Sequence, residues 1–183
     1  GGEPEARPPG NELAIPSEAS SYLDHVVSAA EARLDGMRVV VDCANGAASA
    51  FAPAVLARLG AEVVAIHDEP TGANINVDCG ALHPDVVAEA VVANGADAGV
   101  AHDGDADRAL FADAEGNVID GDQVLAACAI AMKGDETLTG DAVVATVMSN
   151  LGFHRAMREH GIRVISAPVG DRSSTCRTPA RVP

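Results

Sequence analysis

Short apolar runs alternate with helix-like segments along most of the 183-residue chain, and this alternation restricts the fold more than any other feature. Runs rich in valine, isoleucine and alanine are typical of strands buried on both faces of a parallel sheet. The predicted strands are 37–43, 62–66, 98–102, 142–146 and 163–167, and the predicted helices are 20–34, 47–59, 84–94, 123–132 and 153–160. Residues 108–113 and 117–119 are predicted to form a hairpin. The order indicates an α/β fold: a three-layer α/β/α arrangement with a mainly parallel sheet, followed by an incomplete second βαβ unit.

The composition is suited to close packing of helices on a sheet. Apolar residues make up 48% of the chain, which contains one tyrosine, three phenylalanines and no tryptophan. The core must therefore consist mainly of alanine, valine, leucine and isoleucine, which allow helices to approach a sheet closely.

Changes in pattern divide the chain into four expected segments. Residues 1–18 are rich in glycine, proline and glutamate and are predicted to be a flexible tail or linker. An α/β domain is expected over 19–136, the start of a second α/β domain over 137–172, and an irregular tail over 173–183. Because the first residue is not methionine, we expect a fragment or a processed form.

Acidic residues gather directly after the predicted strand 98–102. Asp103, Asp105 and Asp107 alternate with Gly104 and Ala106, so a curled loop could turn all three carboxylates inward. The loop must depart from strand geometry to do so, and we expect Gly104 to permit this. Such an oxygen cage suits Mg²⁺, which prefers carboxylate ligands. The simpler alternative is a solvated acidic loop, although three aspartates without a cation repel one another.

A calcium-binding EF-hand loop also opens with this alternation of aspartates. It is excluded here because Arg108 replaces the glycine needed at the sixth position and Ala114 replaces the glutamate needed at the twelfth. Arg108 itself could form a structural salt bridge with a neighbouring aspartate. Asp120 and Asp122 are interpreted as residues that cap the following helix rather than as metal ligands.

Charge and cysteine content exclude several classes of function. The formal charge is −15, which argues against a nucleic-acid or anionic-membrane partner and indicates that this chain alone would not attract an anionic substrate. The sequence contains no long apolar span and no signal-peptide pattern. The cysteines, at 43, 79, 128 and 176, form no C-x-x-C pair, so reduced thiols and a cytoplasmic location are expected, and a zinc site is not.

Several motifs together resemble the α-D-phosphohexomutase superfamily, with phosphoglucosamine mutases of bacteria as the most similar family. They are VVVDCANGAAS at 39–49, GANIN at 72–76 with Cys79-Gly80, AHDGDADR at 101–108, DGD at 120–122, ATVMSNLG at 145–152 and VGDR at 169–172. The aspartate motif is typical of the superfamily, while the NIN and VMSN motifs favour the glucosamine type over phosphomannomutases or phosphoglucomutases. The resemblance runs from about residue 20 to 172 and implies the second domain and the opening of the third.

The resemblance implies an isomerase that interconverts glucosamine 6-phosphate and glucosamine 1-phosphate for UDP-N-acetylglucosamine and cell-wall synthesis. In that family a phosphoserine exchanges phosphate with the sugar through a bisphosphate intermediate. Mg²⁺ would be held by Asp103, Asp105 and Asp107, and Arg108, Asp171 and Arg172 would contact substrate or phosphate. The partners implied are a hexosamine phosphate and the remaining domains of the same enzyme.

The resemblance has limits that change the expected activity. No stretch of the sequence matches the family's phosphoserine segment, and Ser49, Ser149 and Ser166 stand in other contexts. We therefore expect no catalytic nucleophile in this chain and no turnover by the chain alone. A phosphomannomutase- or phosphoglucomutase-type enzyme, or a catalytically inactive metal-binding module, are the alternatives.

Overall fold

The computed structural model describes residues 17–169, with side chains from residue 20 onward. The tails predicted for 1–18 and 173–183, and the candidate residues Asp171 and Arg172, lie wholly or mainly outside this range. The described part divides into two compact units, with the division between Ile119 and Asp120. Each unit is described by itself.

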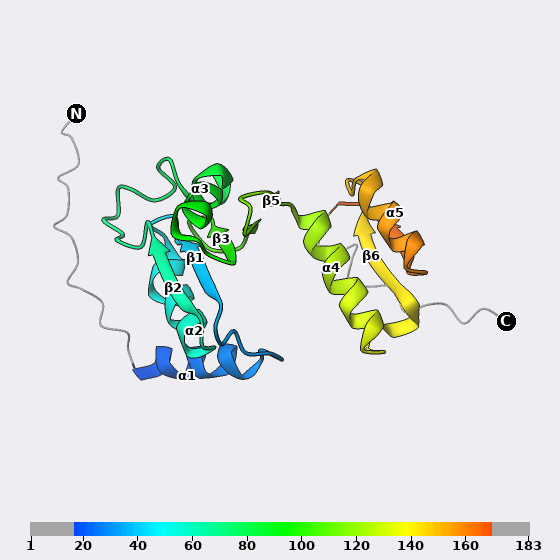
Figure 1. Ribbon diagram of the computed structural model, residues 1–183, viewed down its shortest axis with the longest axis horizontal. Coiled ribbons are helices and arrows are strands. Elements are labelled where there is room, and N and C mark those ends of the chain that lie inside the picture. Colours follow the sequence, from blue (N-terminus) through cyan, green and yellow to red (C-terminus); the bar gives the residue numbers. More distant parts are fainter. Residues whose placement is uncertain (1–16, 170–183) are drawn as a thin grey trace, which may run out of the picture. The chain divides into compact units, whose positions relative to one another are not determined.

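The first unit is built on a five-stranded sheet (Figure 1). The strands lie in the order β2-β1-β3-β4-β5; β1, β2 and β3 are parallel, whereas β4 and β5 return antiparallel as the predicted hairpin. Their bounds are β1 Arg38–Asp42, β2 Glu62–Ile66, β3 Ala98–His102, β4 Ala109–Asp113 and β5 Val118–Ile119. The mainly parallel α/β fold predicted from the sequence is confirmed.

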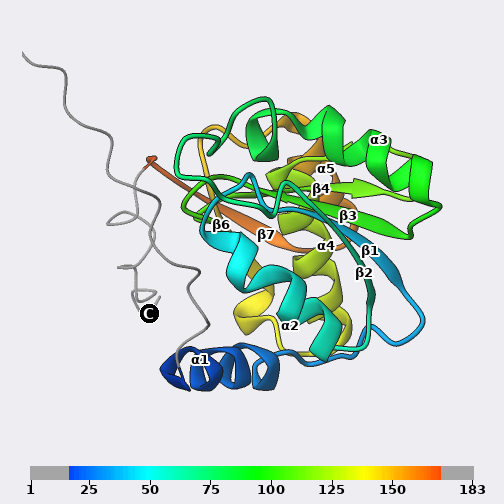
Figure 2. The same ribbon diagram turned by 90° about the vertical axis from the view of Figure 1, so that its left-hand side faces the viewer.

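Helices cover both faces of this sheet (Figure 2). Helix α3 (Pro84–Asn94) packs on one face through Val87 and Val91, which are fully buried with Val40 of the central strand. A Cβ at Gly99 of β3 would come within 2.6 Å of Val91 Cγ2, so glycine allows this close packing. Helix α2 (Ala52–Arg58) covers the other face, with α1 (Ser17–Ser28) packed against it.

Two predicted helices differ from those observed. The helix predicted over 20–34 ends at Ser28, where the serine hydroxyl donates to the carbonyl of His25 at 2.7 Å. The helix predicted over 47–59 is broken at Phe51 into a 3₁₀ turn, η1 (Ala47–Ala50), and α2. Pro53 explains the break: it lacks an N–H and is favoured in the first turn of a helix rather than in its interior.

The second unit contains a parallel pair of strands with helices on one face. Strands β6 (Ala142–Thr146) and β7 (Arg163–Ala167) are joined through α5 (Leu151–Glu159), which is the predicted βαβ unit. Helix α4 (Gly121–Gly134) packs beside α5 over Ala145 and Met157.

The position of α4 explains why the observed division differs from the predicted boundary at 136/137. The apolar residues of α4 pack in the core of the second unit, so this helix belongs with the strands that follow it. At its start, Asp120 accepts from the backbone N–H of Gln123, which confirms the predicted cap. Asp122 instead accepts from the N–H of Asn150 at 2.6 Å, so its predicted capping role is wrong.

The turn of the hairpin β4–β5 gives a pH-dependent contribution to stability. The side chain of Asn117 donates to Asp113 at 2.9 Å and, with the backbone N–H of Asn117, lowers the pKa of this carboxyl. A lowered folded-state pKa stabilises the protein above the unfolded value of about 3.9, and that contribution is lost as the pH falls through the lowered pKa. We expect Asn117→Ala to destabilise the protein at neutral pH, by an amount that shrinks in acid.

Urea unfolding at a series of pH values measures this difference. Asn94→Ala is the matched control, because the Asn94 side chain donates to the carbonyl of Ala90 and faces no carboxylate in that bond. If the loss of unfolding free energy depended on pH equally in both variants, the explanation through the lowered pKa of the turn carboxyl would be excluded.

Candidate metal centre

The aspartate loop joins β3 to β4 at the carboxyl end of β3. It brings together side-chain oxygens of Asp103, Asp105 and Asp107, all within 4.8 Å of one another. Asp103 is buried, with 2% of its surface exposed, whereas Asp105 and Asp107 face solvent. The carboxyl ends of parallel strands are where open α/β sheets bind ligands. All three predicted ligands therefore point toward one small volume.

The backbone of the loop curls through a turn, but not at the residue predicted to allow it. The N–H of Ala106 donates to the carbonyl of Asp103 at 3.0 Å, and Ala106 has a φ of 59°. Gly104, which was expected to supply this freedom, is required for space instead. A Cβ at Gly104 would lie 2.6 Å from Asn76 Nδ2 and 2.7 Å from Ile75 Cδ1.

Neighbouring loops hold the aspartate loop in place through backbone hydrogen bonds. The N–H of Ala47, in the loop after β1, donates to the carbonyl of Gly104 at 2.9 Å. The N–H of Asn76 donates to the carbonyl of Ala44 at 2.9 Å. The long connection 67–83, which contains the GANIN motif, thus supports the aspartate loop.

Arg108 forms an ion pair with the buried member of the three aspartates. Its backbone N–H and its Nε donate to Asp103 at 3.0 and 2.9 Å, and Nε lies 3.6 Å from Asp107. The structural salt bridge considered for Arg108 is therefore present, yet its side chain remains 63% exposed. The guanidinium can hold Asp103 and still face an anion in solvent.

Crowding of the carboxylates shifts their pKa values. The pKa of Asp107 is raised, first by hydrogen bonding with the carboxyl of Asp103 and then by the negative charge of Asp105. Burial alone would raise the pKa of Asp103, but the hydrogen bonds from Arg108 and Asp107 together lower it. Burial also lowers the pKa of His102, which favours the neutral form of this neighbouring imidazole.

This donor set fits a hard divalent cation. It consists only of carboxylate oxygens, and the repulsion that raises the pKa of Asp107 is what a bound cation would relieve. Both oxygens of Asp103 already accept hydrogen bonds, but a carboxylate has about four lone-pair sites, so each oxygen can still face a metal. Mg²⁺ usually binds through a small number of carboxylates and completes its shell with water or substrate oxygens.

A cavity of about 610 Å³ lies beside the loop, lined by residues that include Tyr22, Phe51, Val100, Phe111 and Asp105. Its wall is mainly aliphatic and aromatic, which does not suit a sugar phosphate. The polar side of the centre is instead formed by the exposed carboxylates and by Arg108.

One buried residue next to the centre was missed in the sequence. Asp42 at the end of β1 is fully buried and accepts from the N–H groups of Ala44 and Gly80, both at 2.9 Å. The available signal was an aspartate that directly follows a run of three valines, because a charge in a buried strand requires partners.

The comparisons with known proteins agree with this geometry. The family description "Phosphoglucomutase/phosphomannomutase, alpha/beta/alpha domain II" matches residues 20–116, and the corresponding domain III matches 120–174. Phosphoglucosamine mutase of Frankia alni is 56% identical over 157 residues, covering 86% of this chain and 34% of that protein. Phosphoglucosamine mutase of Symbiobacterium thermophilum is 51% identical over 170 residues, covering 91% and 38%.

A solved structure supports the fold. The phosphoglucomutase/phosphomannomutase family protein of Burkholderia thailandensis superposes with a TM-score of 0.71 at 26% identity, covering 82% of this chain and 33% of that one. The chain thus spans about a third of the length of the relatives it matches. On the matched domains, the shared fold and the relatives above half identity, the chain belongs to the phosphoglucomutase/phosphomannomutase family.

Proposed function

We propose that this chain is the metal-binding part of a phosphoglucosamine mutase, which interconverts glucosamine 6-phosphate and glucosamine 1-phosphate and so supplies UDP-N-acetylglucosamine for the cell wall. The observation that carries the proposal is the convergence of Asp103, Asp105 and Asp107, with Arg108 alongside. The similar proteins of Frankia alni and Symbiobacterium thermophilum bear that enzyme's name. The three described cysteines are unpaired, which accords with the proposed cytoplasmic location.

The residues of this chain have separable roles in the proposed reaction. Bound Mg²⁺ would neutralise charge on the oxygens of the phosphate being transferred. Asp105 and Asp107 face solvent, where a phosphorylated serine and a sugar phosphate could approach. Arg108 orients Asp103 through two hydrogen bonds and presents its exposed guanidinium on the same side.

The length and composition of the described helices concern one further question, whether any of them could span a membrane. None of them combines the length and apolar character needed to cross a membrane.

A chimeric enzyme tests the proposal. Residues 20–169 of this chain would replace the matching segment of the Frankia alni enzyme, and conversion of glucosamine 6-phosphate would be measured with Mg²⁺ and a hexosamine bisphosphate activator. We expect turnover by the chimera and none by the 183-residue chain alone. An inactive but folded chimera would support the inactive metal-binding module, and turnover by the chain alone that is lost in Asp105→Asn would refute the dependence on a separate phosphoserine.

Calorimetry addresses the substrate class. The chain saturated with Mg²⁺ would be titrated with glucosamine 6-phosphate, mannose 6-phosphate and glucose 6-phosphate in turn. Metal-dependent binding that favours the glucosamine compound supports the proposed enzyme. A preference for mannose or glucose phosphate would favour the phosphomannomutase or phosphoglucomutase type.

A further inference from the structure

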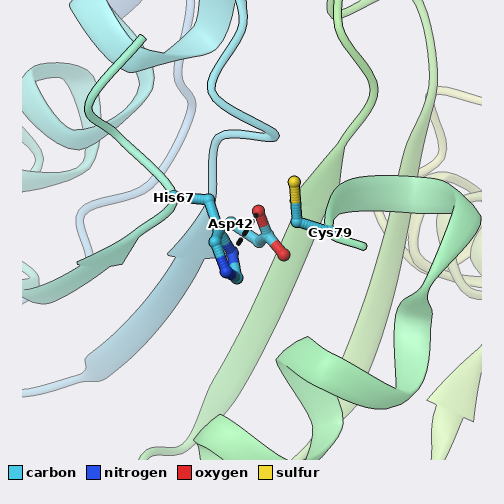
Figure 3. A group of neighbouring side chains, drawn as sticks. All are labelled: Asp42, His67 and Cys79. Carbon is cyan, nitrogen blue, oxygen red and sulfur yellow. Dashed lines mark ion pairs between the residues drawn. The ribbon is translucent and has the colours of Figure 1, made fainter. Parts of the chain in front are cut away.

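A second group of metal-ligating side chains lies at the carboxyl edge of the same sheet, outside the aspartate loop (Figure 3). Asp42 ends β1, His67 directly follows β2, and Cys79 precedes the 3₁₀ turn η2 (Gly80–Leu82). Figure 3 shows His67 and Asp42 pointing toward each other, with the sulfur of Cys79 beside the carboxylate, and one ligand atom of each residue lies within 4.8 Å of the others. Residues far apart in the sequence meet here because β1 and β2 are parallel neighbours.

The contact between His67 and Asp42 has the spacing of two ligands on one metal ion. His67 Nδ1 lies 3.2 Å from Asp42 Oδ1, but the buried Nδ1 makes no hydrogen bond within the described residues. The oxygen therefore lies away from the direction in which a proton on Nδ1 would point. In a tetrahedral zinc site, with bonds of about 2.0–2.2 Å, two such ligand atoms are ~3.4 Å apart; the metal lies along the lone pair of the nitrogen, and the second ligand atom lies off that line.

Asp42 is held in place for such a role by the backbone. Oδ1 accepts from the N–H of Ala44 and Oδ2 from the N–H of Gly80, each at 2.9 Å. Hydrogen bonds of this kind orient the ligands of metal sites, and the carboxylate keeps free lone pairs for a cation. Asp42 and Cys79 are fully buried, whereas the His67 side chain is 34% exposed. An ion can therefore enter beside His67, where a water molecule can complete the coordination.

The chemistry of the donors distinguishes this group from the aspartate loop. Sulfur, imidazole nitrogen and carboxylate oxygen together select a borderline or soft divalent cation, Zn²⁺ above all, whereas Mg²⁺ takes oxygen ligands. We propose that Asp42, His67 and Cys79 form a second metal site that binds Zn²⁺. On binding, the Cys79 thiol releases its proton to solvent as a zinc–sulfur bond forms, and no oxidation or reduction takes place.

The proton release has a measurable consequence. Burial raises the pKa of the Cys79 thiol, and the negative charge of Asp42 adds to this effect. Zinc must therefore displace a proton from the sulfur, so the affinity of the site for Zn²⁺ is expected to rise with pH.

Zinc at this position would join the segments that support the aspartate loop. Ala44, which donates to Asp42, also accepts from the N–H of Asn76, whose Nδ2 would lie 2.6 Å from a Cβ at Gly104. A Cβ at Gly80 would come within 2.5 Å of the carbonyl of His102, the residue before Asp103. Occupancy of the second site would stiffen this support without contributing a ligand to the first.

Cobalt substitution tests the site directly. The metal-free chain would be titrated with Co²⁺ in excess Mg²⁺, and the sulfur-to-cobalt charge-transfer absorption would be recorded. We expect one equivalent to produce this band, Zn²⁺ to remove it by competition, and Cys79→Ser to abolish it. Cys128→Ser, which changes an exposed cysteine, and Asp105→Asn, in the aspartate loop, should both retain it.

His67→Asn provides a second variant if Cys79→Ser does not fold, because His67 is partly exposed and asparagine tolerates its φ of 48°. It should lower the Zn²⁺ affinity about 10- to 100-fold. Absence of the band in the wild-type chain, or its persistence in Cys79→Ser or in folded His67→Asn at unchanged affinity, would overturn the proposal. Loss of Mg²⁺ binding in Asp105→Asn with the cobalt band intact would show that the two sites bind their metal ions independently.

Discussion

Asp105→Asn is expected to lower the Mg²⁺ affinity of the chain about 100-fold and to abolish turnover in the chimeric enzyme. The substitution removes one of the three converging charges while keeping the size of the side chain. Asp105 is exposed, and within the described residues its side chain makes no hydrogen bond, so the fold should be retained. Calorimetric titration with MgCl₂ measures the affinity, and urea unfolding without metal checks the fold.

Glu115→Gln is the matched control for Asp105→Asn. It also removes one negative charge from an exposed position in the same unit, but from the β4–β5 turn rather than the metal centre. Its Mg²⁺ affinity should stay within about twofold of wild type, because exposed charges beyond a Debye length of about 8 Å are largely screened at physiological salt. Equal losses in the two variants would mean that the chain attracts Mg²⁺ through its net charge alone.

Gly46→Ala is expected to destabilise the first unit by about 1–3 kcal/mol and to weaken Mg²⁺ binding as well. A Cβ at Gly46 would overlap the carbonyl oxygen of Gly104, so the loop after β1 and the aspartate loop would have to separate. Alanine tolerates the local φ of −118° and ψ of −156°, so the cost comes from this contact and not from the backbone angles. Urea unfolding and MgCl₂ titration measure the two effects.

Gly134→Ala is the control for an added methyl group. Apart from its chain neighbours and the backbone of its own helix, no heavy atom of the described chain lies within 4 Å of a Cβ at this position, so we expect stabilisation by at most about 1 kcal/mol and no change in Mg²⁺ affinity. If Gly46→Ala left both stability and metal affinity at wild-type values, the proposed support of the aspartate loop by the loop after β1 would be wrong.

Short apolar runs determined most of the fold that could be predicted. The predicted bounds of β2, β3, β6 and β7 agree with the structure residue for residue. Helix bounds were less predictable. Leu34 continued the apolar stripe of α1, but its N–H donates to the carbonyl of Leu59 outside any helix. Such a tertiary hydrogen bond leaves no periodic signal in the sequence.

The two candidate metal sites also differed in how far they could be predicted from the sequence. Asp103, Asp105 and Asp107 are neighbours in the sequence, so their convergence needed only a local turn. Asp42, His67 and Cys79 come from three separate segments, and their meeting depends on which strands are adjacent in the sheet. Sequence spacing gave no zinc motif, and only the strand order brought these residues together.

Both ends of the aspartate loop are fixed by β3 and β4, which pair antiparallel from Ala98 with Asp113 to His102 with Ala109. Folding of the sheet therefore meets most of the entropic cost of arranging the carboxylates before any ion arrives. If the loop binds Mg²⁺ as proposed, such preorganisation would let the ion exchange without unfolding of the loop, with the same carboxylates in position for each new ion. Amide hydrogen exchange across β3 and β4 should then be nearly the same with and without Mg²⁺.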